Sequence, residues 1–136
     1  MYAVVADIER YPEFLPWCAK VIIRKREREG EVEFVTAEMA IAFQALHQRY
    51  VSRVRLDARA PTIEASHIEG PFKRLDTRWR FVPLGTGSEV HFLIDFAFRS
   101  ALLSAVAGVA FGFVAAKMAD AFVRRAHRLY DASRVA

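Results

Sequence analysis

Apolar and polar residues alternate along most of the chain, and a long apolar run replaces this pattern after residue 99. The alternation has a period of two, which is typical of strands that are buried on one face. It predicts six strands, at Cys18–Glu29, Glu31–Phe43, Gln44–Leu56, Thr62–Glu69, Phe72–Pro83 and Glu89–Arg99. Short polar or glycine-containing turns separate them, so we expect an antiparallel meander.

In the last predicted strand the pattern shows most clearly which side chains face the core. Its apolar face carries Val90, Phe92, Ile94, Phe96 and Phe98, whereas His91 and Asp95 lie on the opposite face. A shift of one residue would exchange the two faces, so the pattern predicts one register in which the apolar residues face the core.

The apolar run predicts one long C-terminal helix from Ser100 to Tyr130, with Ser100 as a fair N-cap. Ala101 to Ala116 contains no charged residue, and from Lys117 onward one face is apolar and the other charged. An all-round apolar helix must be covered by protein, ligand, partner or lipid. A membrane span is disfavoured, because 16 residues extend about 24 Å against a hydrocarbon core of roughly 30 Å.

Small residues recur every four positions in the first half of this helix, at Ser104, Gly108, Gly112 and Ala116. The spacing favours close packing of the helix on the sheet. It leaves open a second interpretation, in which the ridge makes room for a ligand beneath the helix.

The segment before the strands predicts a helix over Met1–Ile8 and a second short helix that begins near Pro12 and ends at Pro16. Asp131–Ala136 reads as a frayed tail. The whole chain, 1–136, is expected to form one α+β domain of two layers, with the long helix across the concave face of the sheet.

Composition adds three constraints. Of the 136 residues 54% are hydrophobic and eleven are Phe, which suits either a lined cavity or an ordinary dense core. The single cysteine, Cys18, cannot form an internal disulfide and indicates a reducing compartment. The net charge of +4 favours anionic lipid headgroups or nucleic acid as partners and does not separate the two.

Residues that could perform catalysis do not form a recognisable set. The four histidines, His47, His67, His91 and His127, lack metal-ligand spacing, and no phosphate-binding or zinc motif is present. Asp95 is expected on the solvent side or paired with an arginine. Glu38 could face inward as a polar anchor or outward, and the pattern does not decide between them.

Two segments carry a specific resemblance. Residues 5–18 read Val-Ala-Asp-Ile-Glu-Arg-Tyr-Pro-Glu-Phe-Leu-Pro-Trp-Cys. Residues 70–75 read Gly-Pro-Phe-Lys-Arg-Leu, and the match continues through Trp79-Arg80-Phe81 to residues 96–103. Together they resemble the coenzyme-Q-binding START-domain family, which includes polyketide cyclase and lipid transport proteins and bacterial ribosome association toxins.

The resemblance implies a helix-grip fold, in which a curved antiparallel sheet wraps around the C-terminal helix and encloses an apolar cavity. Family members carry one more strand, before the first helix, which the sequence does not contain. The strand at Glu89–Arg99 is therefore expected to have an unpaired edge.

The function implied by the resemblance is binding or transport of a polyprenyl quinone (ubiquinone) or a similar lipid, without catalysis and with no cofactor beyond the bound ligand. We expect its site to consist of Trp79, Phe81, Phe92, Ile94, Phe96, Phe98, Gly108, Gly112 and Glu38. A cytoplasmic protein at an anionic membrane surface is expected, on the matrix side if mitochondrial. The alternatives are ribosome association and a cyclase-like enzyme, and no DNA partner is expected.

Overall fold

Six antiparallel strands form one sheet in which each strand is hydrogen-bonded to its neighbours in sequence, in the order β1-β2-β3-β4-β5-β6. The structure is a computed structural model that describes residues 2–43, 46–85 and 87–135. The strands are β1 (Cys18–Glu29), β2 (Val32–Phe43), β3 (Leu46–Asp57), β4 (Thr62–Glu69), β5 (Phe72–Leu84) and β6 (Gly87–Phe98). The predicted meander is confirmed, and the boundaries that can be compared differ by two residues at most. The predicted start of the third strand, Gln44, lies outside the described residues.

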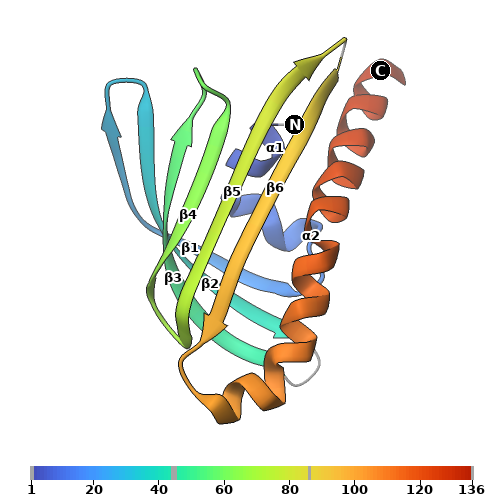
Figure 1. Ribbon diagram of the computed structural model, residues 1–136. Helices are drawn as coiled ribbons and strands as arrows, with labels where there is room; N and C mark the ends of the chain where they lie inside the picture. Colours follow the sequence, from blue (N-terminus) through green and yellow to red (C-terminus); the bar gives the residue numbers. More distant parts are fainter. Residues whose placement is uncertain (1, 44–45, 86, 136) are drawn as a thin grey trace.

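The sheet is strongly curved, and the three helical segments lie on its concave side (Figure 1). Register shifts in the β1–β2, β3–β4 and β5–β6 pairs contribute to this curvature, since an irregular extra residue bends a strand. The helical segments are α1 (Tyr2–Ala6), the 3₁₀ helix η1 (Ile8–Glu13) and α2 (Ala101–Val135). This is the predicted α+β helix-grip arrangement.

Helix α2 begins where the sequence predicts. The Ser100 side-chain oxygen accepts a hydrogen bond from the Leu103 backbone N–H at 3.2 Å, which caps the first turn. The helix continues to Val135, so the expected frayed tail after Tyr130 is helical. Pro12 lies near the end of η1 instead of at its start, because that helix begins four residues earlier, at Ile8.

The apolar first half of α2 is covered on one side only. Phe111 and Val114 are buried against the sheet, whereas Leu102, Val109 and Phe113 are 76%, 86% and 51% exposed. We call these last three residues the outer stripe. Among the described residues, none of the helices contains an apolar stretch of the length that a bilayer span requires.

The strand facings follow the predicted alternation. On β6, Val90, Phe92, Ile94, Phe96 and Phe98 pack with the two core clusters, while His91 and Asp95 are exposed. Asp95 Oδ2 accepts a hydrogen bond from Arg74 Nε at 3.0 Å on the outer face, as expected of a solvent-side carboxylate. The predicted register of the last strand is confirmed.

Candidate ligand-binding site

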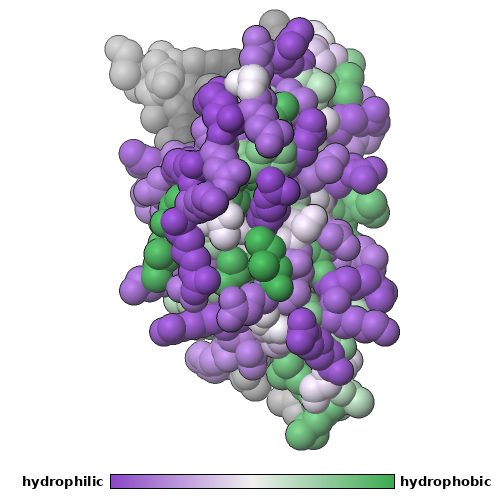
Figure 2. All heavy atoms as spheres, turned by 90° about the vertical axis from the view of Figure 1, so that its left-hand side faces the viewer, coloured by the Kyte–Doolittle hydropathy of each residue, from purple (hydrophilic) through white to green (hydrophobic). Residues whose placement is uncertain are grey.

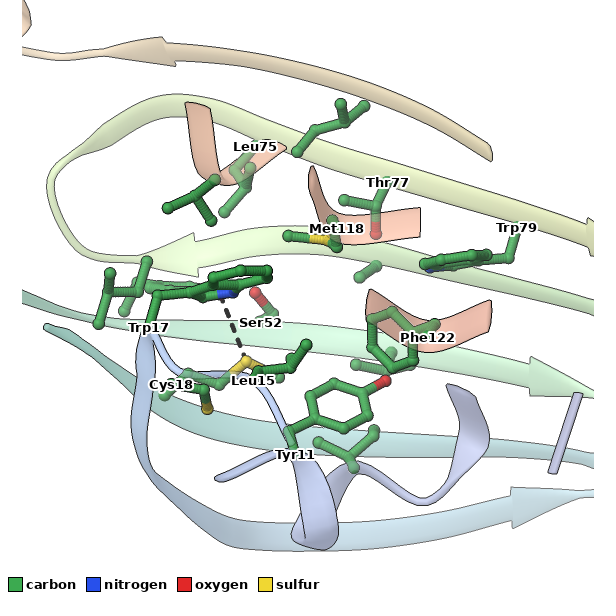
Figure 3. A pocket seen from close by; sticks show the side chains of 18 of the residues that line it. Tyr11, Leu15, Trp17, Cys18, Ser52, Leu75, Thr77, Trp79, Met118 and Phe122 are labelled. Carbon is green, nitrogen blue, oxygen red and sulfur yellow. Dashed lines mark hydrogen bonds between the residues drawn. The ribbon is translucent and has the colours of Figure 1, made fainter. Parts of the chain in front are cut away.

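An internal cavity of about 80 Å³ lies between the concave face of the sheet and α2 (Figure 3). Its walls come from β1 to β6, from α2, and from η1 and the segment that follows it. Among the described residues, no Asp, Glu, Lys, Arg or His lines it. The cavity is therefore an apolar enclosure with a few neutral polar groups.

Strand alternation supplies the sheet side of the cavity. Every second residue of β3 points inward, so Tyr50, Ser52 and Val54 all reach the lining. Strand β5 contributes Leu75, Thr77 and Trp79 in the same way, and these stand next to one another in Figure 3.

Helix α2 supplies the opposite wall through one helical face. Phe111, Val114, Met118 and Phe122 follow each other at spacings of three, four and four residues and so project on the same side. Phe122 is 2% exposed, and its ring meets that of Trp79 edge to face at a centroid distance of 5.1 Å. This contact joins the helix to the sheet at one end of the cavity.

The segment around η1 closes the third side. Tyr11, Leu15, Trp17 and Cys18 contribute to the lining, and the Tyr11 ring lies edge-on to Phe122 at 5.0 Å. The Tyr11 hydroxyl donates to the Val5 carbonyl, which ties this segment to α1. The aromatic residues Tyr11 and Trp17 are thus part of the cavity wall, a role that the sequence pattern alone did not reveal.

The polar groups of the cavity are held in their neutral forms. Burial is the main cause that raises the pKa of the Cys18 thiol to about 11, and burial also raises the pKa of Tyr11 and Tyr50 above the usual tyrosine range. The Tyr50 hydroxyl donates to the Met39 sulfur at 3.3 Å. At neutral pH the cavity thus offers hydroxyl and thiol groups and no charge.

Two of the predicted site residues, Trp79 and Ile94, line the cavity. Four other predicted aromatic residues point inward but pack behind the lining. Phe81 and Phe92 contact Trp79 at centroid distances of 6.0 and 4.3 Å. Phe96 and Phe98 pack with Phe111, at 4.5 and 5.8 Å.

The remaining three predicted residues lie elsewhere. A Cβ atom built on Gly112 would meet nothing within 4 Å, and one on Gly108 would meet only the Ser104 hydroxyl at 3.8 Å. Neither glycine lines the described cavity, whose helix side is formed by the face that carries Phe111. Glu38 points outward, and its carboxylate pairs with Arg24 at 2.9 Å.

The sequence did not predict most of the cavity-lining residues that come from α2 and from the N-terminal segment. Met118 and Phe122 were recognisable as the buried stripe of the helix, but nothing in their spacing distinguishes a cavity wall from an ordinary core. Within the described part of the chain no group of three His, Cys, Asp or Glu side chains could hold a metal ion.

A sequence model described as "Polyketide cyclase / dehydrase and lipid transport" matches residues 1–123. The chain belongs to this family. It is 37% identical over 130 residues to the ribosome association toxin RatA of Rickettsia prowazekii, which covers 93% of this chain and 86% of that protein. It is 33% identical to the mitochondrial coenzyme Q-binding protein COQ10 homolog B of Xenopus laevis, over 99% of this chain and 55% of that protein.

Solved structures agree with the fold. An 18 kDa protein from Caulobacter crescentus superposes with a TM-score of 0.74 and 38% identity, over 94% of this chain and 86% of the other. The Zhui aromatase/cyclase from Streptomyces sp. R1128 has the same TM-score of 0.74 at 20% identity, over 93% and 84% of the two chains. At that identity the likeness concerns the fold alone.

Proposed function

We propose that the protein binds a polyprenyl quinone such as ubiquinone, or a similar hydrophobic lipid, between the sheet and α2, and that it is not an enzyme. The observation that carries this proposal is the uncharged cavity with an apolar lining. Affinity would come from apolar surface removed from water, at about 25 cal/mol per Å². The coenzyme Q-binding relative supports the same ligand class.

The cavity size sets how such a ligand would fit. Ligand pockets usually measure about 300–1,000 Å³, and this cavity measures about 80 Å³. A protein cavity that holds a single benzene ring measures about 150 Å³, so even the ring of a quinone would require this space to widen. A long tail would pass out between α2 and the sheet, or α2 would move away from the sheet to admit it.

The outer stripe suits exchange of this ligand at a membrane. Leu102, Val109 and Phe113 present apolar side chains on the outside of α2, and the Lys117 ammonium lies 5.8 Å from the centre of the Phe113 ring. Apolar residues flanked by basic ones are typical of helices that rest on anionic bilayers. We propose peripheral association with the cytoplasmic face of a membrane, or with the matrix face in a mitochondrion.

Chemical identification of a co-purifying ligand tests the proposal. The protein is purified without detergent and extracted with organic solvent, and the extract is analysed by mass spectrometry. A quinone or isoprenoid lipid in near-stoichiometric amount is expected. Protein free of lipid that also fails to take up ubiquinone-10 from vesicles would contradict the proposal.

Ribosome association is the second candidate, and the 37% identical ribosome association toxin favours it. Much of the basic charge on β1 is already paired with acidic side chains, as in Arg24–Glu38, Arg26–Glu33 and Arg28–Glu33, at 2.9 to 3.2 Å. The side of the molecule at the left of Figure 1 is mainly hydrophilic, with smaller hydrophobic areas (Figure 2). Co-sedimentation with ribosomal subunits at 150 mM salt would support this candidate, whereas release of the protein from the subunits below that salt would count against it.

A further inference from the structure

His67 is a half-buried polar side chain that the cavity description leaves unexplained. It lies on the inward face of β4, and both imidazole nitrogens are shielded from solvent. Neither makes a well-formed hydrogen bond among the described residues, and the Gly70 backbone offers only a weak one. Its ring centre is 5.4 Å from that of Phe72 and 6.4 Å from that of Tyr50. An imidazole surrounded by aromatic rings thus has unused donor and acceptor capacity.

This arrangement is unfavourable for folding. A shielded polar group without a well-formed hydrogen bond destabilises the folded state, whereas an apolar side chain among the same aromatic rings would not. Such groups in folded proteins call for an explanation, and a missing ligand is one.

The position of His67 places it at one end of the cavity. It follows Ala65 by two residues on the same face of β4, and it is directly opposite Ser52 in the β3–β4 pair. Ala65, Ser52 and Tyr50 all line the cavity. Side chains on one face of adjacent strands are neighbours at about 5 Å, so His67 stands beside Ser52, next to the lining and outside it.

The Tyr50 hydroxyl is a second polar group at this end of the cavity, and its hydrogen bond is weak. Its only described hydrogen bond goes to the Met39 thioether sulfur, which is a weak acceptor. A ligand oxygen would be a better partner for the Tyr50 hydroxyl than this sulfur.

The turn after β4 holds the imidazole in place. Gly70 has a φ of +140°, and a Cβ built there would lie 2.9 Å from both His67 Cε1 and Tyr50 Cβ. The backbone therefore packs directly on both side chains, which leaves them little freedom to turn away. The polar end of the cavity is formed before any ligand arrives.

We propose that His67, assisted by Tyr50, binds the oxygen-bearing head of the ligand by donating its ring N–H to a carbonyl oxygen, while the apolar lining holds the tail. This inference rests on the proposed function and adds the part of the ligand that is recognised. The second ring nitrogen can accept a hydrogen bond from a hydroxyl, so a quinone and its reduced quinol both satisfy the site.

The imidazole of His67 is in its neutral form when it donates this hydrogen bond to the ligand. Burial is the main cause that lowers the pKa of His67 below 6.5, and the Arg99 guanidinium acts in the same direction. The Gly70 backbone and the Asp76 carboxylate act in the opposite direction. A neutral imidazole has one donor and one acceptor, which is the pair that a quinone–quinol couple requires.

The test compares two probes on three proteins. The probes are ubiquinone with two isoprene units and an isoprenoid hydrocarbon of equal tail length without a head group. The proteins are the wild type, His67→Leu and His67→Gln, of which the last keeps an amide donor and acceptor. Affinity is measured by titration, and thermal stability is measured on the empty proteins.

We expect His67→Leu to bind the quinone about 10-fold more weakly, because one hydrogen bond is lost. Its affinity for the hydrocarbon should be unchanged, and its melting temperature should be equal to or above that of the wild type. His67→Gln should recover part of the quinone affinity.

Three results would overturn the inference. Equal quinone affinity in the wild type and His67→Leu would show that the imidazole makes no contact with the head group. Parallel loss of both affinities together with a lower melting temperature would make His67 a structural residue only. If the wild type binds neither probe, the proposed function itself fails, and the inference fails with it.

Discussion

Cys18 shows how burial controls the chemistry of a single residue. The thiol lies in the cavity wall, and burial raises its pKa from 9.0 to about 11. The thiolate is the reactive form, so two pKa units reduce its population about 100-fold at pH 8. The residue thus behaves as a small hydrophobic side chain in the folded protein.

We predict that iodoacetamide at pH 8 modifies Cys18 at least about 100-fold more slowly in the native protein than in 6 M guanidinium chloride. Because the raised pKa belongs to the folded state, stability should also fall as the pH rises from about 9 toward 11. Mass spectrometry of timed samples gives the alkylation rate. Similar rates in the two conditions would contradict this account of the thiol.

At the scale of single residues, the sequence predicted which face a side chain lies on better than what that side chain contacts. Alternation correctly placed Trp79 and Ile94 on the inward face. It could not show that Phe96 packs against Phe111 instead of lining the cavity, because that depends on how far α2 stands from the sheet. The lack of a hydrogen-bond partner for His67 likewise depends on tertiary neighbours.

Helix α2 is the element in which pattern and structure differ most. Its small-residue ridge suggested either tight packing or ligand space, and at Gly112 the structure leaves open space, where a Cβ would meet nothing within 4 Å, on a face that does not line the described cavity. The helix rotates Phe111, Val114, Met118 and Phe122 toward the sheet instead, because these larger side chains remove more apolar surface from water.

We predict that Gly112→Ala stabilises the protein by about 0.5–1 kcal/mol, since alanine loses less backbone entropy in a helix and has open space there. Quinone binding should be unchanged. Urea unfolding and a quinone titration on the same variant provide the measurements.

Gly70→Ala is the matched control, because its φ of +140° and its contacts at 2.9 Å make an added methyl group strained and destabilising. If Gly112→Ala destabilises the protein or abolishes quinone binding, the small-residue ridge does line the ligand site.

The sheet of the whole molecule has an edge strand at each end, β1 and β6. Among the described residues β6 pairs only with β5, and Leu93 on its outer face is 62% exposed. An edge strand presents backbone N–H and C=O groups to other chains. The resemblance to the family predicted this edge, which local patterning alone could not, because pairing partners are a property of the complete sheet.

We predict concentration-dependent self-association that Leu93→Lys reduces, since a lysine near an edge opposes pairing between copies. Sedimentation velocity over a 100-fold range of protein concentration measures it. An ideal monomer throughout the range would show that the edge does not recruit a second chain.

The proposed function depends on the cavity being the ligand site. The two tryptophans of the chain allow binding there to be measured directly by fluorescence. Trp17 and Trp79 both line the cavity, and a quinone in contact with an indole ring quenches its fluorescence. Ala65→Leu places a larger side chain in the cavity, while Ala116→Leu makes the same change at an exposed position of α2.

The measurement is a titration of intrinsic fluorescence with ubiquinone of two isoprene units. The account predicts saturable quenching of the wild type and of Ala116→Leu with one ligand per chain, and its loss in Ala65→Leu at unchanged fold. Quenching that never saturates, or that saturates equally in Ala65→Leu, would contradict the account.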